Sequence, residues 1–230
     1  MTQSIDGSVS LQELFKKHPS TMEVLFPHDG KAYEWACNVY NYRIKKRPGA
    51  IAFCKNADHV SFCFKVAVRT KVKVTVRSGG HHHEGMCLND GGIVIDVSAM
   101  EHGEVHPDPT EEFDFGYAEF EPGRRLKHII DDLTLEKRVI PVGGCQTVRI
   151  GGLVQGGGWG ASYRQLGVTS DWLEEVDIVI PDGEILTLNK EGITEHSKGK
   201  LPESVKDNGC LLYTSPSPRD LSTSRMPSSA

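Results

Sequence analysis

The alternation of apolar and polar residues predicts that the first half of the chain contains a helix between two strands. Residues 50–54 form a short apolar run, and residues 72–76 alternate valine with lysine or threonine, which is the two-residue period of a strand. Between them, apolar side chains recur at the spacing of one buried helical face, from a cap at Asn56 or Asp58 to about Arg69. We therefore predict a β-α-β unit that places the 72–76 strand beside the 50–54 strand.

Further short elements are predicted on both sides of this unit. Ser10 can cap a short helix through Phe15, and another helical turn is expected at residues 21–26. The aromatic residues Trp35 and Tyr40 are expected to serve packing rather than to line a ligand site. Later segments predict strands at 93–96, 101–106 and 112–120, a helix after Gly123, and a hairpin of residues 176–180 and 184–188 around a Pro-Asp-Gly turn.

Composition narrows the classes of function. The chain has 230 residues, of which 38% are hydrophobic and 25% charged, as is typical of a globular protein. A net charge of −5 gives no reason to expect nucleic acid or an anionic membrane as a partner, and no apolar run approaches the roughly 20 residues that span a bilayer. The first residues lack the apolar core of a signal peptide, so a cytoplasmic or undetermined location is expected. Six scattered cysteines without a CxxC pair favour free thiols.

A candidate anion site directly follows the 72–76 strand. Its sequence is Arg77-Ser78-Gly79-Gly80-His81, with Gly85 shortly after. Glycine tolerates positive φ and the close approach of another group, and successive N–H groups in such a turn can form an anion-binding nest. Arg77 adds a fixed positive charge suited to phosphate. The stretch predicts a pyrophosphate site with His81 at its mouth, although two glycines after a strand are equally typical of a simple turn.

A second stretch favours the ligand interpretation. Eight of the twenty residues from Pro141 to Gly160 are glycine. No packed helix or strand requires so many, whereas a main chain that wraps closely around a ligand does.

The two stretches together resemble a known family. They contain Arg77-Ser78-Gly79-Gly80-His81, then Gly143-Gly144-Cys145-Gln146-Thr147-Val148, then Gly156-Gly157-Gly158-Trp159-Gly160. This order is similar to the flavin-binding half of the vanillyl-alcohol-oxidase and p-cresol-methylhydroxylase (PCMH) superfamily, and most of all to its berberine-bridge-enzyme-like oxidases. The resemblance covers roughly residues 40–190. Arg149 departs from it, because the family usually has a small residue there.

The resemblance implies a fold. It predicts an α+β, two-lobed FAD-binding domain of the PCMH type. The small lobe, residues 45–107, would contain the β-α-β unit, and the second lobe, residues 108–190, would be a larger antiparallel sheet with helices. FAD would lie between the lobes, because each contributes one glycine loop.

The resemblance also implies a chemistry. It predicts an oxidase that transfers a hydride from an alcohol, sugar or secondary-metabolite substrate to FAD and then passes the electrons to O2. In doubly attached members of the family, a histidine placed as His81 bonds the 8α-methyl carbon of the flavin and a cysteine placed as Cys145 bonds ring carbon 6. The catalytic base comes from a later substrate domain, so none is assigned here. The expected cofactor-binding residues are Arg77, Ser78, Gly79, Gly80, His81, Gly85, Cys145, Thr147, Val148, Gly151, Gly152, Gly156, Gly157, Gly158, Gly160 and Val179.

Two alternatives stay open at this level. The chain could be a non-catalytic flavin-binding protein, or His81, His83 and Cys87, with Cys145, could bind zinc. The spacing of those four residues fits no common zinc module, so we expect no metal site. His82 and His83 are expected to face solvent or the flavin edge.

The expected domain organisation has three parts. Residues 1–44 form an N-terminal helical and irregular segment, and residues 45–213 form the FAD-binding domain. Residues 214–230 are rich in Ser, Pro and Arg and are expected to be a disordered, non-native tail, the alternative being a natural disordered one. Because the sequence departs from the family near Tyr213, the chain is interpreted as truncated before the substrate domain.

Overall fold

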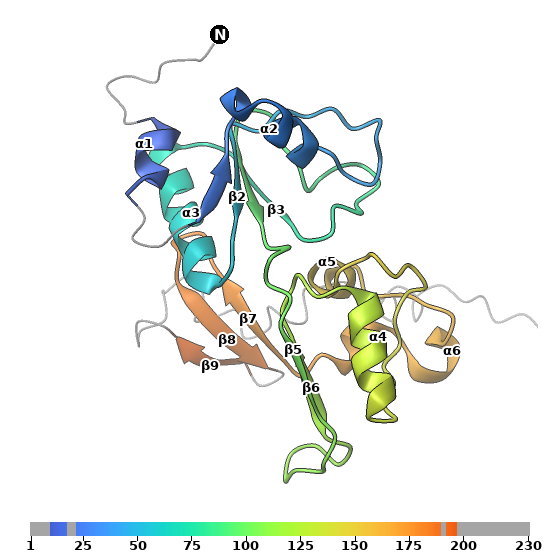
Figure 1. Cartoon of the computed structure of the whole chain (residues 1–230). Helices are drawn as coiled ribbons and strands as arrows, with labels where there is room; N and C mark the ends of the chain where they lie inside the picture. The colour runs from blue at the N-terminus through green and yellow to red at the C-terminus, as the bar shows by residue number, and fades with distance from the viewer. Residues whose placement is uncertain (1–9, 18–21, 190–191, 197–230) are drawn as a thin grey trace, which may run out of the picture. The chain divides into compact units, whose positions relative to one another are not determined.

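The computed structural model describes residues 10–17, 22–189 and 192–196, and the chain divides into two compact units (Figure 1). The first unit comprises residues 1–100 and 179–185, and the second comprises residues 101–178 and 186–230. The division thus follows Met100, whereas the sequence suggested residue 107. It falls earlier because the strand at 103–106 pairs within the second unit. The tail expected at 214–230 lies outside the described residues.

A four-stranded sheet forms the centre of the first unit, with strand order β1-β2-β4-β3. Strand β1 is antiparallel to β2, whereas β2, β4 and β3 are mutually parallel. The strands are β1 (Glu23–Leu25), β2 (Ala50–Phe53), β3 (Val74–Arg77) and β4 (Ile93–Asp96).

Two expectations about this sheet are wrong. The helical turn expected at residues 21–26 is not formed by their described part, residues 22–26, because residues 23–25 pair with β2 as an edge strand. Strand β3 does not lie beside β2, because β4 lies between them. The physical reason is burial: all four residues of β4 are buried, as a central strand requires, whereas β3 carries half-buried and exposed positions suited to an edge.

The helices of the first unit follow local signals in the sequence. Helix α3 (Ala57–Thr70) begins at Asn56, whose side chain accepts a hydrogen bond from the backbone N–H of His59, as expected of an N-cap. Helix α1 (Leu11–Phe15) begins with a capping box formed by Ser10 and Glu13. Two further short helices are η1 (Pro27–Asp29) and α2 (Lys31–Ala36).

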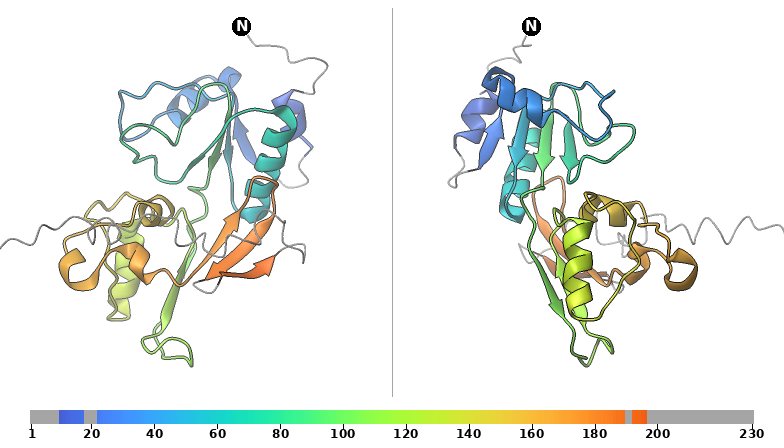
Figure 2. Two further views of the ribbon diagram at one scale, coloured as in Figure 1. Left: turned by 180° about the vertical axis from the view of Figure 1, so that it is seen from behind. Right: turned by 45° about the vertical axis from the view of Figure 1, so that its right-hand side comes forward.

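Each face of the sheet carries its own core because side chains alternate along each strand. Figures 1 and 2 show α3 on one side of the sheet and α2 on the other. On one face, Ala50 and Ala52 of β2 pack with Ile93 and Ile95 of β4 against α1 and α3. On the other face, residues of α2 and of the loop after β3 cover the sheet. The members of this second core are Tyr33, Ala36, Val39, Ile51, Cys87, Leu88 and Val94.

The turn at residues 181–183 belongs to the first unit although its hairpin is continuous with the second. Ser61 of α3 donates a hydrogen bond to the carbonyl oxygen of Gly183. Gly183 has φ +83°, and an added Cβ would lie 2.7 Å from Lys65 Cε. Contact with α3 therefore requires glycine at this turn.

The second unit contains two sheets and the remaining helices. Strand β5 pairs antiparallel with β6, and a separate three-stranded sheet has the order β7-β8-β9. The described part thus holds two small sheets where one larger antiparallel sheet was expected. Its elements are β5 (Gly103–His106), β6 (Tyr117–Phe120), α4 (Leu126–Leu135), α5 (Ile150–Gln155), α6 (Tyr163–Leu166), η2 (Thr169–Trp172), β7 (Glu175–Val179), β8 (Ile185–Asn189) and β9 (Gly192–His196).

Helix α4 builds the core of the second unit. Leu126, Ile129 and Leu133 recur on one face of the helix and are buried. They pack against β5, β6 and the glycine-rich segment, through Val148, Ile150 and Leu153 among others. None of the helices in the described part of the chain combines the length and hydropathy required to cross a bilayer.

Candidate functional site

Arg77, an expected cofactor-binding residue, ends β3 and forms a buried ion pair. Its side chain is 7% exposed, and Nε lies 2.5 Å from Oδ2 of Asp96, whose side chain is 3% exposed. Nη1 donates to the carbonyl oxygen of Ala36 at 2.6 Å, close to the end of α2. The guanidinium therefore ties β3 to β4 and to α2, at the base of the loop that follows.

That loop is shaped by two glycines. Gly80 has φ +67° and Gly85 has φ +62°. A Cβ added to Gly85 would lie 2.5 Å from Ile44 Cγ2, so both backbone conformation and packing require glycine there. Lys46, which precedes β2, also restrains the loop, because its Nζ donates to the carbonyl oxygens of Gly85 at 2.8 Å and of Leu88 at 3.1 Å. Ser78 and Gly79 are half-buried and lie between Arg77 and this turn.

Three histidines follow the glycines and have different surroundings. His81 is half-buried, and its ring is stacked on Tyr40 with centroids 4.9 Å apart and planes inclined by 22°. His82 and His83 are exposed, as expected. His82 Nδ1 accepts a hydrogen bond from the backbone N–H of Glu84 at 3.1 Å. His83 meets the edge of Tyr40, with centroids 6.2 Å apart.

The zinc alternative finds no support in the described residues. No group of three or more histidine, cysteine or acidic side chains in the described ranges is arranged to hold a metal ion. Cys87 is buried, and burial raises the pKa of its thiol. The five cysteines that the structure describes are free thiols: Cys37, Cys54, Cys63, Cys87 and Cys145.

Cys145 lies in the second unit, in the turn before α5, and is exposed. Its Sγ lies 3.6 Å from Oγ1 of Thr147. Hydrogen bonds from the hydroxyl and then the backbone N–H of Thr147 lower the pKa of the Cys145 thiol, because they stabilise the thiolate. The turn is closed by the N–H of Val148, which donates to the carbonyl oxygen of Cys145 at 3.2 Å. An accessible thiol with a lowered pKa has the properties of a nucleophile.

Three of the expected glycines are required by the protein itself. A Cβ on Gly151 would lie 2.6 Å from Cβ of Pro122. A Cβ on Gly158 would overlap the side chain of Thr169, and one on Gly160 would overlap the carbonyl group of Val142. Gly157 and Gly158 also have positive φ, at +88° and +77°. Contacts within the second unit therefore explain these three glycines without a ligand.

Two other glycines have no such explanation. Gly144 and Gly152 have ordinary φ, are exposed, and nothing lies within 4 Å of a Cβ built on either. Gly152 even lies inside α5, where glycine is less favourable than alanine by about 0.5–1 kcal/mol. Gly143 and Gly156 would make only ordinary contacts. Open main chain on either side of an exposed thiol fits a ligand that approaches the backbone closely.

The departure at Arg149 is explained by its contacts. Its side chain, 10% exposed, bonds to Oε1 of Glu101 at 2.5 Å and donates to the carbonyl oxygen of Gly123. The arginine thus packs within the second unit instead of occupying the space beside the glycine loop. Val179, the last expected residue, packs as a partly buried side chain against the first core.

Apart from Val179, the expected residues therefore form two groups, one in each unit. The first spans residues 77–85 and the second spans residues 145–160. Sequence reasoning missed Tyr40, Lys46 and Asp96, which hold the first group. Only Asp96 left a signal, because a carboxylate at the end of a buried apolar strand requires a partner.

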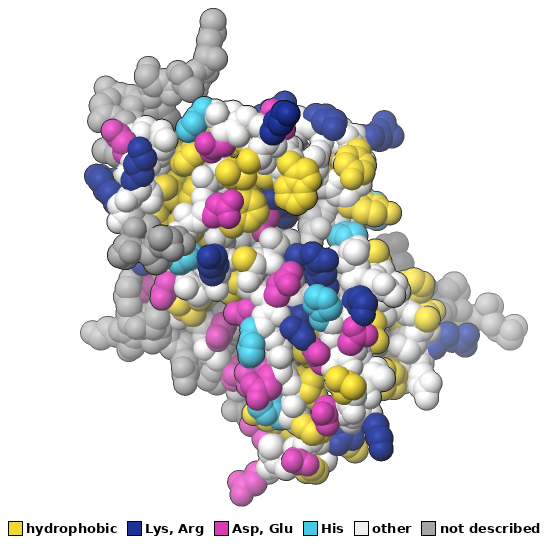
Figure 3. All heavy atoms as spheres, viewed as in Figure 1, with side chains coloured by type: hydrophobic (Ala, Val, Ile, Leu, Met, Phe, Trp, Pro, Cys, Tyr) yellow, Lys and Arg dark blue, Asp and Glu magenta, His cyan; other side chains and the backbone are white. Residues whose placement is uncertain are grey.

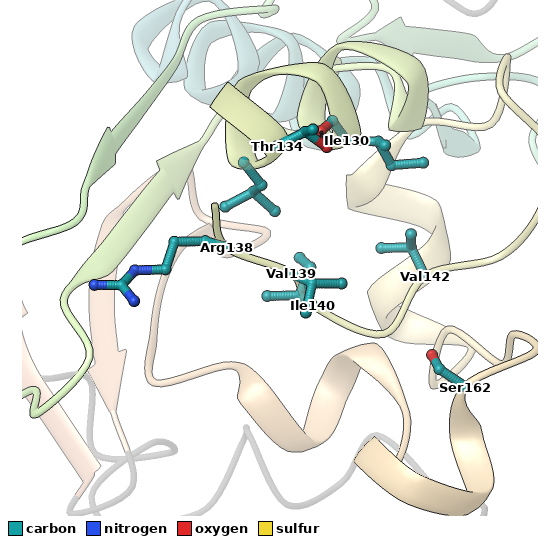
Figure 4. A pocket seen from close by; sticks show the side chains of 8 residues that line it. Ile130, Thr134, Arg138, Val139, Ile140, Val142 and Ser162 are labelled. Atoms are coloured by element: carbon teal, nitrogen blue, oxygen red, sulfur yellow. Dashed lines mark hydrogen bonds between the residues drawn. The ribbon is translucent and has the colours of Figure 1, made fainter. Parts of the chain in front are cut away.

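A separate hollow of about 220 Å³ lies beside α4 in the second unit (Figure 4). Its lining is mainly apolar and includes none of the expected site residues. The lining residues are Ile130, Leu133, Thr134, Arg138, Val139, Ile140, Val142 and Ser162.

On the face shown in Figure 3, acidic and basic side chains are interspersed.

Comparison with known proteins identifies the family. The FAD binding domain family matches residues 48–189, more than half of the chain. The FAD-linked oxidoreductase pynB of Aspergillus niger is 34% identical over 140 residues, which cover 61% of this chain and 25% of that protein. The xylooligosaccharide oxidase of Thermothelomyces thermophilus is 30% identical over 162 residues, which cover 68% of this chain and 31% of that protein.

A solved structure agrees with these matches. Physcomitrella patens BBE-like 1 is 29% identical, with a TM-score of 0.69 over 79% of this chain and 38% of that chain. The chain thus spans between a quarter and a third of the length of these two curated relatives. The resemblance inferred from the two glycine motifs is confirmed. The chain belongs to the FAD binding domain family and has the α+β fold of the PCMH-type domains in BBE-like oxidases.

Proposed function

We propose that this chain is the FAD-binding part of a flavin-dependent oxidoreductase. The observation that carries the proposal is the position of Cys145, an exposed thiol of lowered pKa inside the glycine loop that the FAD binding domain family matches. The relatives that support an oxidase are named xylooligosaccharide oxidase and chitooligosaccharide oxidase. By analogy with them, we propose a small-molecule substrate, an alcohol, a sugar or a secondary metabolite, with O2 as electron acceptor.

The residues of the chain fit a bound FAD in two ways. The turn at residues 79–80 would contribute backbone N–H groups to a pyrophosphate, and the ion-paired Arg77 lies shortly before it in the chain. Gly144 and Gly152 leave the main chain open on either side of Cys145. Bound FAD would supply two-electron oxidation of the substrate, which no side chain of this chain can perform.

We further propose that FAD is attached through both His81 and Cys145. Cys145 meets the requirement for attachment by sulfur, because Thr147 stabilises its thiolate. His81 follows the two glycines directly and is partly accessible. The two residues belong to different units, so their attachment to one flavin stays a prediction. No residue of this chain is proposed as the catalytic base.

The test is peptide mass spectrometry of the chain after incubation with FAD and proteolysis. We expect flavin mass on the peptides of both His81 and Cys145. His81→Ala should leave flavin on the cysteine peptide alone, and Cys145→Ala should leave it on the histidine peptide alone. The double variant should release all its flavin on acid precipitation. Protein that contains FAD but carries flavin on neither peptide would contradict double attachment, while a colourless protein that never retains FAD would contradict the function itself.

A further inference from the structure

Tyr40 has an arrangement that packing alone does not explain. Its ring is stacked on His81, with centroids 4.9 Å apart and planes inclined by 22°, yet the residue is 60% exposed. An exposed ring buries little apolar surface, so its contribution to the core is small. Offset stacking at this separation nevertheless has a definite geometry and fixes the plane of the partner ring.

The backbone brings Tyr40 to this position independently of its side chain. The N–H of Tyr40 donates to the carbonyl oxygen of Gly80 at 2.9 Å. The next residue, Asn41, donates from Nδ2 to the carbonyl oxygen of His83 at 2.7 Å. The segment before β2 is thus bound on both sides of His81 by hydrogen bonds that do not involve the tyrosine ring. Replacing the tyrosine ring would leave these hydrogen bonds in place.

We propose that Tyr40 is a positioning residue that holds the imidazole of His81 in the orientation needed for its attachment to flavin. The inference rests on the proposed attachment through His81. The terminal torsion of a histidine is broad, so a free imidazole samples many orientations. A stacked ring restricts this motion to the plane of the stack. The nitrogen then points in a fixed direction, which brings the pair closer to a reactive geometry before the flavin reacts.

The attachment that Tyr40 would assist is a balanced two-electron step. His81 would form a bond from its unprotonated ring nitrogen to the 8α-methyl carbon, which would lose one hydrogen, while the other ring nitrogen would release its proton. That hydrogen and that proton, with the two electrons of the broken C–H bond, would reduce the flavin ring. O2, the acceptor of the proposed oxidase, then takes up two electrons and two protons to give hydrogen peroxide and restores the oxidised ring.

The experiment compares three variants with the unaltered 230-residue chain. Tyr40→Ala removes the stacked ring, Tyr40→Phe keeps it, and Tyr42→Ala removes a tyrosine of the same segment that is 72% exposed. Apoprotein is incubated with FAD, and flavin mass on the His81 and Cys145 peptides is followed with time. In flavin-free protein, NMR reports the His81 ring protons, which a stacked aromatic ring shifts upfield.

We expect Tyr40→Ala to form the His81 linkage about two- to tenfold more slowly, which is the range that one aromatic stack supplies. Tyr40→Phe and Tyr42→Ala should form the His81 linkage at the rate of the unaltered chain. The rate of the Cys145 linkage should be unchanged in all three variants. Only Tyr40→Ala should lose the upfield shift of the His81 ring protons. Equal His81 rates in Tyr40→Ala and the unaltered chain would overturn this inference alone. Equal slowing of both linkages would reveal a general structural role and overturn it too. Absence of flavin from His81 in the unaltered chain would instead overturn the proposed attachment.

Discussion

Removing the guanidinium of Arg77 should destabilise the first unit rather than simply weaken flavin binding. Arg77→Ala leaves the carboxylate of Asp96 without its cation in a position that is 3% exposed. Breaking a buried ion pair by removing one partner costs about 3–5 kcal/mol, because the remaining charge stays buried. That is a large share of the total stability of a domain, which is about 5–15 kcal/mol.

The chain offers a matched control in Arg47, which pairs with Glu34 in the same unit. The side chains of that pair are 58% and 56% exposed, so solvent screens them. Arg47→Ala should therefore change the stability of the first unit far less than Arg77→Ala does. The assay is urea unfolding, with native-state hydrogen exchange at the amides of β3 and β4 to report on the first unit.

A compensating variant keeps the prediction testable if Arg77→Ala does not fold. Asp96 Oδ1 accepts from the N–H of Ser98 at 2.8 Å, and the amide oxygen introduced by Asp96→Asn can still accept that hydrogen bond. Combining Arg77→Met with Asp96→Asn removes both charges and should recover most of the lost stability, since a buried pair can be replaced at little cost. If Arg77→Ala is as stable as Arg47→Ala but binds FAD poorly, the guanidinium is a phosphate ligand and the reasoning is refuted.

Two further predictions concern the glycine loop. Thr147→Val should raise the pKa of the Cys145 thiol, because it removes the hydroxyl that stabilises the thiolate. The pH profile of iodoacetamide alkylation should therefore move to higher pH. An unchanged profile would show that the Thr147 hydroxyl does not lower the pKa of Cys145. Gly158→Ala should lower the melting temperature, because the added Cβ would overlap Thr169. Gly152→Ala should raise the stability of flavin-free protein by about 0.5–1 kcal/mol. The same variant should weaken FAD binding, measured by fluorescence titration. Unchanged FAD affinity in Gly152→Ala would show that the ligand does not approach there.

Local elements of the fold were predictable because their signals lie close together in the sequence. Helix α3 begins at the predicted cap, and the alternating valines form β3. The helical turn predicted at residues 21–26 was wrong because a short apolar segment takes its conformation from the strand with which it pairs. Neighbouring residues do not contain the information that β2 would pair with residues 23–25.

The candidate site divides in a similar way. The glycine-rich loops, His81 and Cys145 were found from sequence, because glycine clusters and a cysteine in their midst are local features. The sequence did not predict which glycines are required by packing and which have open space beside them. It depends on Thr169 and Val142, which approach Gly158 and Gly160 only in the folded chain.

The sequence by itself determined local elements such as α3 and β3, the existence of two glycine-rich loops, and the family to which they belong. Only the tertiary structure decided that Arg77 pairs with Asp96, that β4 separates β2 from β3, and that Tyr40 stacks on His81. The physical reason is the range of the interactions. Caps, turns and periodicity are set by residues a few positions apart, whereas the partner of a buried charge or ring is chosen by packing between segments that are distant in the chain.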